Sequence, residues 1–305
     1  MTHAATTLVA PSRLAAFKEA AAGDLGLIVI PGAIWGASFL FIAEGLHATG
    51  PFGVAFFRVF AGFLTLLAFP AARAPIARQA WPRIAVLSVV WMAVPLTLFP
   101  FAEQRISSAM AGMLNGAVPL FATFVAALIA RQMPSRTILQ GLAVGMSGVV
   151  LVAWPNVQQG GASLEGVLLV LTAVSLYSIA INVARPLQLT YGALPVLLRA
   201  LGLAALLLAP LGAPQVLSGT WTLKPFLSLL TLGVFGTGVA YVLGTIAAGK
   251  LGAARASASI FITAPVALML GVVVLQEHVA TLSVVGAIMC IAGAMLIRRP
   301  DSSKR

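Results

Sequence analysis

Few residues in this sequence have the types and spacing needed for chemistry. The segment Gly145-Met-Ser147-Gly148 has the G-x-S-G form used by intramembrane serine proteases. A serine nucleophile needs a neighbouring base to accept its proton. The histidines, His3, His47 and His278, lie in tails or between apolar runs and never within a run. We therefore expect Ser147 to pack against a neighbouring helix, and we expect no enzyme.

Metal and redox chemistry have equally little support. The single cysteine, Cys290, lies inside the last apolar run, so neither a disulfide framework nor a cysteine zinc site can form within the chain. We expect no catalytic residue, no metal and no cofactor.

Two arginines, Arg58 and Arg199, fall inside apolar runs. A charge at the centre of a membrane span costs about 2.5–3.5 kcal/mol, so each must have a compensating role. Both lie about a turn and a half from the end of their run, where snorkelling or pairing with carbonyl groups lowers the cost. Binding of an anionic substrate group and structural anchoring both remain open for this pair.

Neutral polar and aromatic side chains recur inside the runs, whereas no Asp, Glu, Lys or His lies near the middle of one. Without such a group no proton relay is evident. Aromatic walls with neutral hydrogen-bonding groups suit a small zwitterion with a variable side chain. The candidate substrate-binding residues are Trp35, Ser38, Trp91, Asn115, Tyr177, Ser178, Tyr241 and Thr263. Each of them alone is more often a contact between packed helices than a ligand contact.

The amino-acid composition indicates whether water or lipid surrounds these residues. Of the 305 residues, 60% are hydrophobic and 8% are charged, whereas a soluble domain carries about 25% charged residues. The net charge of +11 comes from basic residues spread singly and in pairs between apolar runs. This distribution is typical of membrane loops and argues against a nucleic-acid partner. We expect a lipid bilayer as the surroundings.

Apolar runs of about 20 residues span a bilayer as helices. Charges, prolines and glycines divide the sequence into ten such runs, and the break between the sixth and seventh is expected at Arg185 and Pro186. The first run is too long for a cleavable signal peptide. The preceding segment either forms a short interfacial helix or stays disordered. The predicted spans cover 25–45, 52–70, 84–102, 108–130, 137–154, 164–183, 194–210, 226–248, 255–276 and 281–298.

The basic residues predict the orientation of these spans. If the amino terminus is cytoplasmic, only Arg105 and Lys224 fall in outside loops, while Glu44, Glu103, Glu165 and Glu277 all lie outside. This asymmetry follows the positive-inside rule. The inside residues are Arg13, Lys18, Arg73, Arg78, Arg83, Arg131, Arg136, Arg185, Lys250, Arg255, Arg298, Arg299, Lys304 and Arg305.

The sequence also repeats itself. The block 117–131 resembles the block 263–277, and each precedes a helix with two glycines seven residues apart. Because each repeat holds five spans, an odd number, the second must be inverted relative to the first, as in many transporters. Pro119 and Pro265 occupy matching positions, where they are either hinges for alternating access or static kinks. The helix glycines are Gly141 and Gly148 in the first repeat, and Gly286 and Gly293 in the second.

These features resemble the drug/metabolite transporter superfamily in its ten-helix EamA-type form, over about residues 26–298. The resemblance rests on the segment 33–39, on Phe56-Phe-Arg58, on the Pro119 block and on 264–277. Within the superfamily the chain looks most like the YddG aromatic amino-acid exporter group. The first repeat departs from the pattern, because Arg131 stands where the second repeat has Glu277.

The resemblance implies an all-α integral membrane fold of two inverted five-helix repeats and a transport role in the bacterial inner membrane, with both termini cytoplasmic. We expect segments at 1–23 (cytoplasmic), 24–155 (first repeat), 156–299 (second repeat) and 300–305 (cytoplasmic tail). The expected function is export of amino acids of broad specificity, aromatic and other apolar ones included, by a monomer. Export of hydrophobic drugs or of another metabolite, such as a nucleoside or sugar phosphate, is the alternative. An intramembrane enzyme is disfavoured, and a purely structural membrane protein would not need matched repeats.

Overall fold

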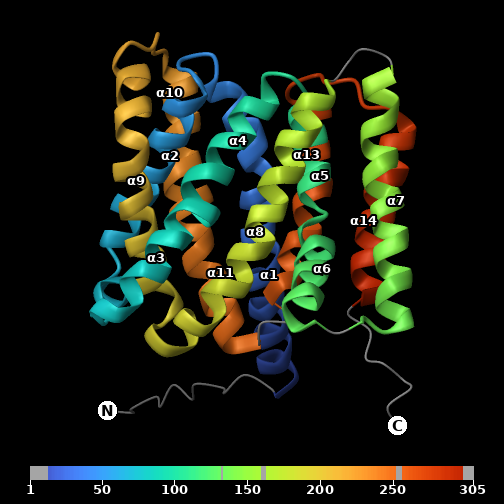
Figure 1. The fold of residues 1–305 in the computed structure, drawn as a ribbon, viewed down its shortest axis with the longest axis horizontal. Coiled ribbons are helices and arrows are strands. Elements are labelled where there is room, and N and C mark those ends of the chain that lie inside the picture. Colours follow the sequence, from blue (N-terminus) through green and yellow to red (C-terminus); the bar gives the residue numbers. More distant parts are fainter. Residues whose placement is uncertain (1–12, 132, 159–162, 252–255, 298–305) are drawn as a thin grey trace, which may run out of the picture.

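The computed structural model describes residues 13–131, 133–158, 163–251 and 256–297. Within these ranges the chain is helical and folds into one bundle of antiparallel rods (Figure 1). We call the lower side in Figure 1, where α1 begins and α14 ends, the terminal face, and the other side the opposite face.

The rods follow one another along the chain as ten spans. Seven helical stretches are long and apolar enough to cross a membrane, and three shorter apolar helices complete the set. This confirms the predicted all-α fold. In order the spans are α1 (Arg13–Gly45); α2 (Pro51–Leu67); α3 (Trp81–Leu87) with η3 (Ser88–Ala93) and α4 (Val94–Glu103); α5 (Ser108–Asn115) with α6 (Val118–Ala130); α7 (Arg136–Gln158); α8 (Leu164–Tyr191); α9 (Ala193–Leu217); α10 (Leu223–Thr231) with η4 (Leu232–Val239) and α11 (Ala240–Leu251); α13 (Ile260–Val273); and α14 (Thr281–Ile297).

Short 3-10 turns connect some of these helices. Two of them, η1 (Pro70–Arg73) and η2 (Arg78–Ala80), lie between the second and third spans, and η5 (Ser257–Ser259) precedes α13. The third span therefore starts at η2, earlier than predicted.

The predicted break between the sixth and seventh spans was wrong. Helix α8 continues through Arg185 and Pro186 to Tyr191, and the chain turns at Gly192, whose φ is 85°. Proline ends a helix only where the freed carbonyl cannot be satisfied, and inside a bundle neighbouring helices tolerate it. Glycine adopts a positive φ at little cost, so the turn forms there.

Two spans contain π-helical segments at matching places in the repeats. They are η3 in the third span and η4 in the eighth. A π-helical turn inserts an extra residue into the helix and is frequent at functional sites. The pattern of apolar residues gave no sign of either segment.

The contacts between spans repeat in the two halves. Helix α1 packs on α13 as α8 packs on α6, and α2 packs on η4 as α9 packs on η3. The pairs α2 with α9 and α7 with α14 map onto themselves when the halves are exchanged. This is the contact pattern of two inverted five-helix repeats, as predicted.

The helix glycines hold α7 against α14. A Cβ on Gly148 would lie 2.5 Å from the carbonyl oxygen of Gly286, and a Cβ on Gly293 would lie 2.5 Å from the carbonyl oxygen of Gly141. Only glycine permits such close contact of two backbones, which is how helices associate where lipid removes the hydrophobic drive. Because the two helices run antiparallel, the same close contact of their backbones occurs twice, seven residues apart along each helix.

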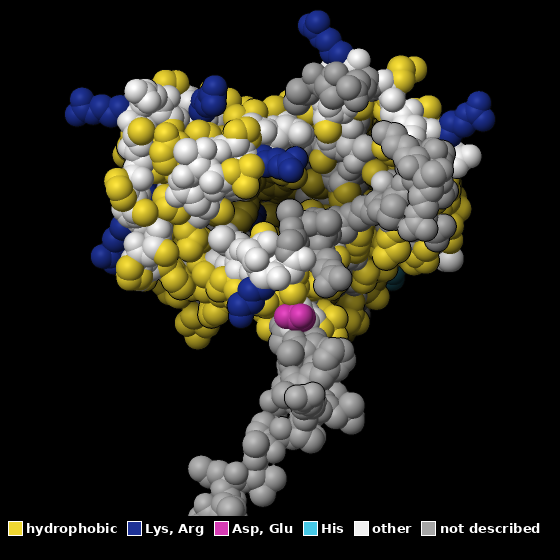
Figure 2. All heavy atoms as spheres, turned by 90° about the horizontal axis from the view of Figure 1, so that it is seen from below, with side chains coloured by type: hydrophobic (Ala, Val, Ile, Leu, Met, Phe, Trp, Pro, Cys, Tyr) yellow, Lys and Arg dark blue, Asp and Glu magenta, His cyan; other side chains and the backbone are white. Residues whose placement is uncertain are grey.

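The outer surface of the bundle is apolar. Leucine, valine and phenylalanine side chains project from the spans, and Leu206 is 71% exposed. Lysine and arginine side chains project around the rim of the terminal face, which is hollowed near its middle (Figure 2). An apolar belt with a basic end is stable only in a bilayer, so the chain is a multi-pass integral membrane protein.

Candidate functional site

A cavity of about 80 Å³ lies between the two halves of the bundle. Four of its lining residues follow one face of α1 at positions i, i+3, i+4 and i+7, and the others come one each from α2, α4, α5, α8 and α11. Six spans from both repeats therefore meet at one point. The lining residues are Trp35, Ser38, Phe39, Ile42, Arg58, Phe99, Asn115, Tyr177 and Tyr241.

Six of the predicted site residues are brought together here: Trp35, Ser38, Arg58, Asn115, Tyr177 and Tyr241. Trp91 does not line the cavity but packs behind Tyr241: the two rings meet edge-on, with 5.9 Å between their centroids. Trp91 is thus a support for the wall and not part of its described surface.

Aromatic rings form two walls of the cavity. The ring of Tyr241 lies between Trp35, at 5.7 Å, and Trp91. The ring of Phe99 contacts Phe39 at 5.5 Å and Tyr177 at 5.9 Å. Such ring pairs stabilise by about 0.5–1.5 kcal/mol each beyond the area they bury, so each ring helps to hold its neighbours in position.

Arg58 supplies the positive charge of the cavity. Its side chain is 7% exposed, and Nε donates to Oγ1 of Thr237 at 2.8 Å. Thr237 is fully buried in the π-helical segment η4, so the eighth span orients the guanidinium. No described residue accepts from the two terminal nitrogens of Arg58, although guanidinium has five N–H donors in total. The free donors can bind an anion in the cavity.

Arg199, the match of Arg58 in the second repeat, has other partners. Its Nη1 donates to the carbonyl of Ala72 at 2.6 Å and its Nη2 to the carbonyl of Arg73 at 3.3 Å. These bonds tie α9 to the 3-10 turn η1 at the terminal face. The two arginines occupy matching positions in the repeats but have different surroundings.

Asn115 ends α5 beside the cavity, and its side-chain oxygen Oδ1 is buried without a hydrogen-bond partner among the described residues. The helix is interrupted after it, where Gly116 and Ala117 form a turn before α6 begins. Pro119 sits in the first turn of α6, next to this break, whereas α13 passes through Pro265 without interruption. The matched prolines thus have unequal surroundings, and the hinge role remains a prediction.

Ser178 and Thr263 lie outside the cavity. Ser178 is fully buried, and its hydroxyl donates to the carbonyl of Val174 at 2.8 Å and lies 3.4 Å from the carbonyl of Val118. Thr263 is 1% exposed where α13 crosses Gly36 of α1, whose Cβ would lie 2.8 Å from the Thr263 carbonyl. The geometry at both positions is that of packed helices. Ser147, expected to pack against a helix, is instead exposed on α7, so that prediction was wrong.

Sequence reasoning missed Phe39, Ile42 and Phe99. The first two share the face of α1 that carries Trp35 and Ser38, so helical periodicity could have found them. Apolar side chains in apolar runs otherwise give no signal.

Glu103 was also missed, because the sequence placed it with the acids of the outside loops. It is the last residue of α4, and both carboxylate oxygens are buried without a partner in the described part of the chain. It lies one helical turn after Phe99, which lines the cavity. A titratable group therefore lies nearer the cavity than the sequence indicated.

Glu277, unlike Glu103, has hydrogen-bond partners. Its carboxylate accepts from the backbone N–H of Ser108 at 2.7 Å and of Ala109 at 2.8 Å. Anionic groups are stabilised at a helix N-terminus, so Glu277 caps α5 from the connection between α13 and α14.

Comparison with known proteins agrees with this architecture. The model of the EamA-like transporter family matches residues 23–154 and 164–299, which are the two halves of the bundle. A solved crystal structure superposes with a TM-score of 0.59 at 16% sequence identity, over 91% of this chain and 97% of that chain, and so shares the fold.

Curated relatives are similar over nearly the whole chain. A protein of Streptantibioticus cattleyicolor named "Probable terminal-alkyne amino-acid exporter" is 28% identical over 91% of this chain and 94% of its own length. An uncharacterized transporter of Bacillus subtilis, YdfC, is 24% identical over 85% of this chain and 86% of its own length. The family model, matched by both halves of a ten-span bundle, places this chain in the EamA-like transporter family, as a membrane transporter and not an enzyme.

Proposed function

We propose that this chain exports amino acids of broad specificity, including aromatic and other apolar ones, across a bacterial inner membrane. The central cavity alternates between the two faces of the bundle while the two inverted repeats move against each other. The terminal face is cytoplasmic in this proposal, and a single copy of the chain suffices.

The charges support this orientation. The basic residues of the opposite face are each paired with an acid: Arg105 with Glu165 at 2.9 Å and Lys224 with Glu44 at 2.6 Å. The rim of the terminal face carries projecting lysine and arginine side chains (Figure 2). Excess positive charge marks the cytoplasmic side.

The observation that carries the proposal is the combination of Arg58 and Asn115 in an aromatic cavity. An amino-acid carboxylate would accept from the free nitrogens of Arg58, and its ammonium would donate to Oδ1 of Asn115, which lacks a partner among the described residues. Tyr177 and Tyr241 line the same cavity, and aromatic rings attract a cation placed over their faces. The carboxylate and the ammonium group of a zwitterion would thus each have a partner in the cavity.

The size of the cavity bears on specificity. A volume of about 80 Å³ holds roughly five to eight waters at 10–15 Å³ each. That space suits a small amino acid, so an aromatic one requires the rings of the walls to move apart. The Streptantibioticus relative is named as a probable amino-acid exporter, which supports the same substrate class.

A sugar phosphate or nucleotide carries more negative charge than one guanidinium can balance. Arg199 supplies no second charge here, because backbone carbonyls of η1 engage it. The described cavity therefore favours a zwitterion over a polyanion.

Ligand-induced thermal stabilisation of the purified protein tests this chemistry. A ligand at 100 times its Kd stabilises the folded state by about 2.7 kcal/mol. We expect alanine, leucine and tryptophan to raise the Tm, and the amines that lack their carboxylates to leave it unchanged. Arg58→Gln should abolish the shift, whereas Arg199→Gln, which alters a matched arginine outside the cavity, should keep it.

Stabilisation by the amines as strongly as by the amino acids would contradict the proposal. So would an Arg58→Gln variant that keeps the full amino-acid shift. A shift with sugar phosphates alone would assign the cavity to another substrate class.

A further inference from the structure

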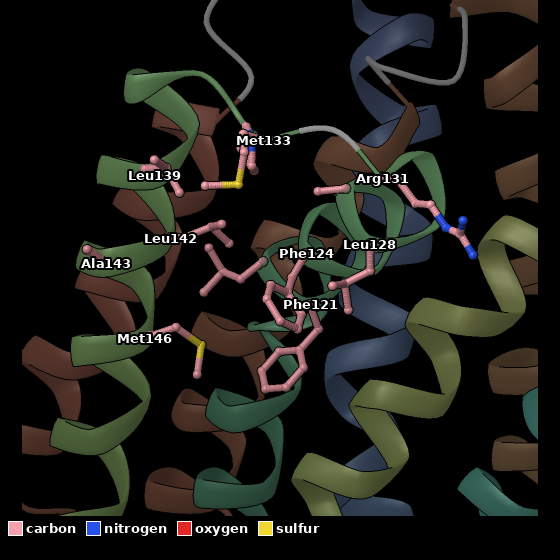
Figure 3. A pocket seen from close by; sticks show the side chains of 12 residues that line it. Phe121, Phe124, Leu128, Arg131, Met133, Leu139, Leu142, Ala143 and Met146 are labelled. Atoms are coloured by element: carbon pink, nitrogen blue, oxygen red, sulfur yellow. The ribbon is translucent and has the colours of Figure 1, made fainter.

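A second cavity, larger than the central one, lies away from that site. It is an open groove of about 690 Å³ between α6 and α7, in their terminal-face halves (Figure 3). Its walls are apolar, and Phe124 and Leu128 on α6 are 51% and 61% exposed. The lining residues are Leu120, Phe121, Phe124, Ala127, Leu128, Arg131, Met133, Pro134, Leu139, Leu142, Ala143 and Met146.

The groove exists because α7 packs far more extensively on α14 than on α6, its neighbour in sequence. The glycine contacts at Gly141 and Gly148 draw α7 against α14. The side chains of Phe121 and Phe124 point from α6 into the space that remains, opposite Leu142 and Met146 of α7 (Figure 3).

Water is a poor occupant of this groove. A bound water needs two to four polar partners, and every lining residue except Arg131 is apolar. The groove opens from the apolar side of the bundle, so hydrocarbon chains of the bilayer can enter it.

The end of the groove at the terminal face is basic. Arg131 follows α6 with a left-handed backbone, φ 50°, and its side chain is exposed. Its counterpart in the second repeat is Glu277, which caps α5. A cation cannot perform that capping, and no described acid forms an ion pair with Arg131. Arg136, the first residue of α7, is exposed after the same short connection.

From these contacts we infer that the groove binds one anionic phospholipid from the leaflet at the terminal face. One acyl chain lies between Phe124 and Met146. The side chain of Arg131, which extends away from α7 in Figure 3, turns toward the groove so that the headgroup phosphate accepts its hydrogen bonds. Basic pockets between membrane helices recognise anionic headgroups in this way. The bound chain fills the gap between α6 and the α7–α14 pair, and so supports their arrangement.

The inference does not depend on the transported substrate. Native mass spectrometry of the full chain in detergent, with added phosphatidylglycerol or phosphatidylcholine, tests it. We expect one phosphatidylglycerol retained per chain, and phosphatidylcholine retained about fivefold less, the equivalent of ~1 kcal/mol for one arginine near the surface.

Two variants with matched controls separate the headgroup from the chain. Arg131→Gln should remove the preference for phosphatidylglycerol, while Arg83→Gln, an exposed arginine outside the groove, should keep it. Glutamine suits the backbone there, because Gln276 has a similar φ of 56°. Ala143→Trp should fill the groove and lower retention of both lipids, while Ala292→Trp, an exposed position on α14, should not.

Equal retention of the two lipids by the unmodified chain would overturn the inference. It would also fail if Arg131→Gln kept the preference, or if Ala143→Trp and Ala292→Trp retained lipid equally. Oleate bound as tightly as phosphatidylglycerol would show that one acyl chain with any anionic head suffices, and would overturn the recognition of a phosphate.

Discussion

At the residue scale, partners decide what each charged or polar group does in this bundle. Arg58 and Arg199 are matched by the repeat, yet one lines the cavity and the other is held by backbone carbonyls. Glu103 and Glu277 are both acids near the opposite face, yet one has no described hydrogen-bond partner and the other has two. Sequence position alone distinguishes neither pair.

The two acids should therefore respond differently to removal of charge. Glu277→Gln loses the charge that two N–H groups at the start of α5 require, and we expect a loss of about 1–2 kcal/mol in stability. Glu103→Gln breaks no described hydrogen bond and removes a carboxyl group whose charged form burial disfavours, so its stability should equal or exceed that of the unmodified chain. Thermal unfolding in detergent at neutral pH compares them. A larger loss for Glu103→Gln than for Glu277→Gln would refute this account.

Two buried threonines give a second residue-scale prediction. Thr237→Val leaves Nε of Arg58 without its acceptor, which should cost about 1–3 kcal/mol. Thr97 is the control, because its hydroxyl donates to the carbonyl of Ala93 within its own helix at 2.7 Å. Thr97→Val should change stability by about 0.5 kcal/mol or less. Equal melting temperatures for the two variants would mean that Thr237 does not hold Arg58.

At the element scale, the sequence predicted the features that follow from the spacing of its apolar residues and glycines. Runs of apolar residues gave all ten spans, and glycines seven apart in the fifth and tenth spans lie where α7 meets α14. The π-helical segments η3 and η4 were not predictable in this way, because an inserted turn depends on packing against neighbouring spans. The end of α8 was misplaced for the same reason, since Pro186 is accommodated by the bundle.

The contact of α7 with α14 gives an element-scale prediction. A Cβ on Gly148 would lie 2.5 Å from the Gly286 carbonyl and 2.7 Å from the Cys290 nitrogen, so Gly148→Ala must push the helices apart. We expect a loss of about 1–3 kcal/mol, as for overpacked cores. Gly249 in α11 has nothing within 4 Å of its Cβ position, so Gly249→Ala should be neutral or stabilise by up to ~1 kcal/mol. Equal melting temperatures for Gly148→Ala and Gly249→Ala would show that α7 and α14 are not in tight contact at Gly148.

At the scale of the whole molecule, the inverted repeat explains why the cavity forms where it does. Spans from both halves contribute one side chain or more, and residues as far apart in sequence as Trp35 and Tyr241 meet there. The sequence named six of the nine lining residues because aromatic and polar groups stand out in apolar helices. It could not separate lining from packing for Ser178 or Thr263, because the side of a helix that faces the cavity depends on how the spans assemble.

The central claim is that amino acids cross the membrane through the cavity that contains Arg58. Counterflow in liposomes tests it most directly: vesicles holding unlabelled leucine and the purified protein are diluted into labelled leucine, and the initial rate of label uptake is measured. The account predicts transient accumulation of label, an about 10- to 100-fold lower rate for Arg58→Gln, as expected for the loss of a hydrogen bond from a charged group, and an unchanged rate for Arg83→Gln. Absence of accumulation for leucine and every other amino acid, or an Arg58→Gln rate equal to that of the unmodified chain, would contradict it.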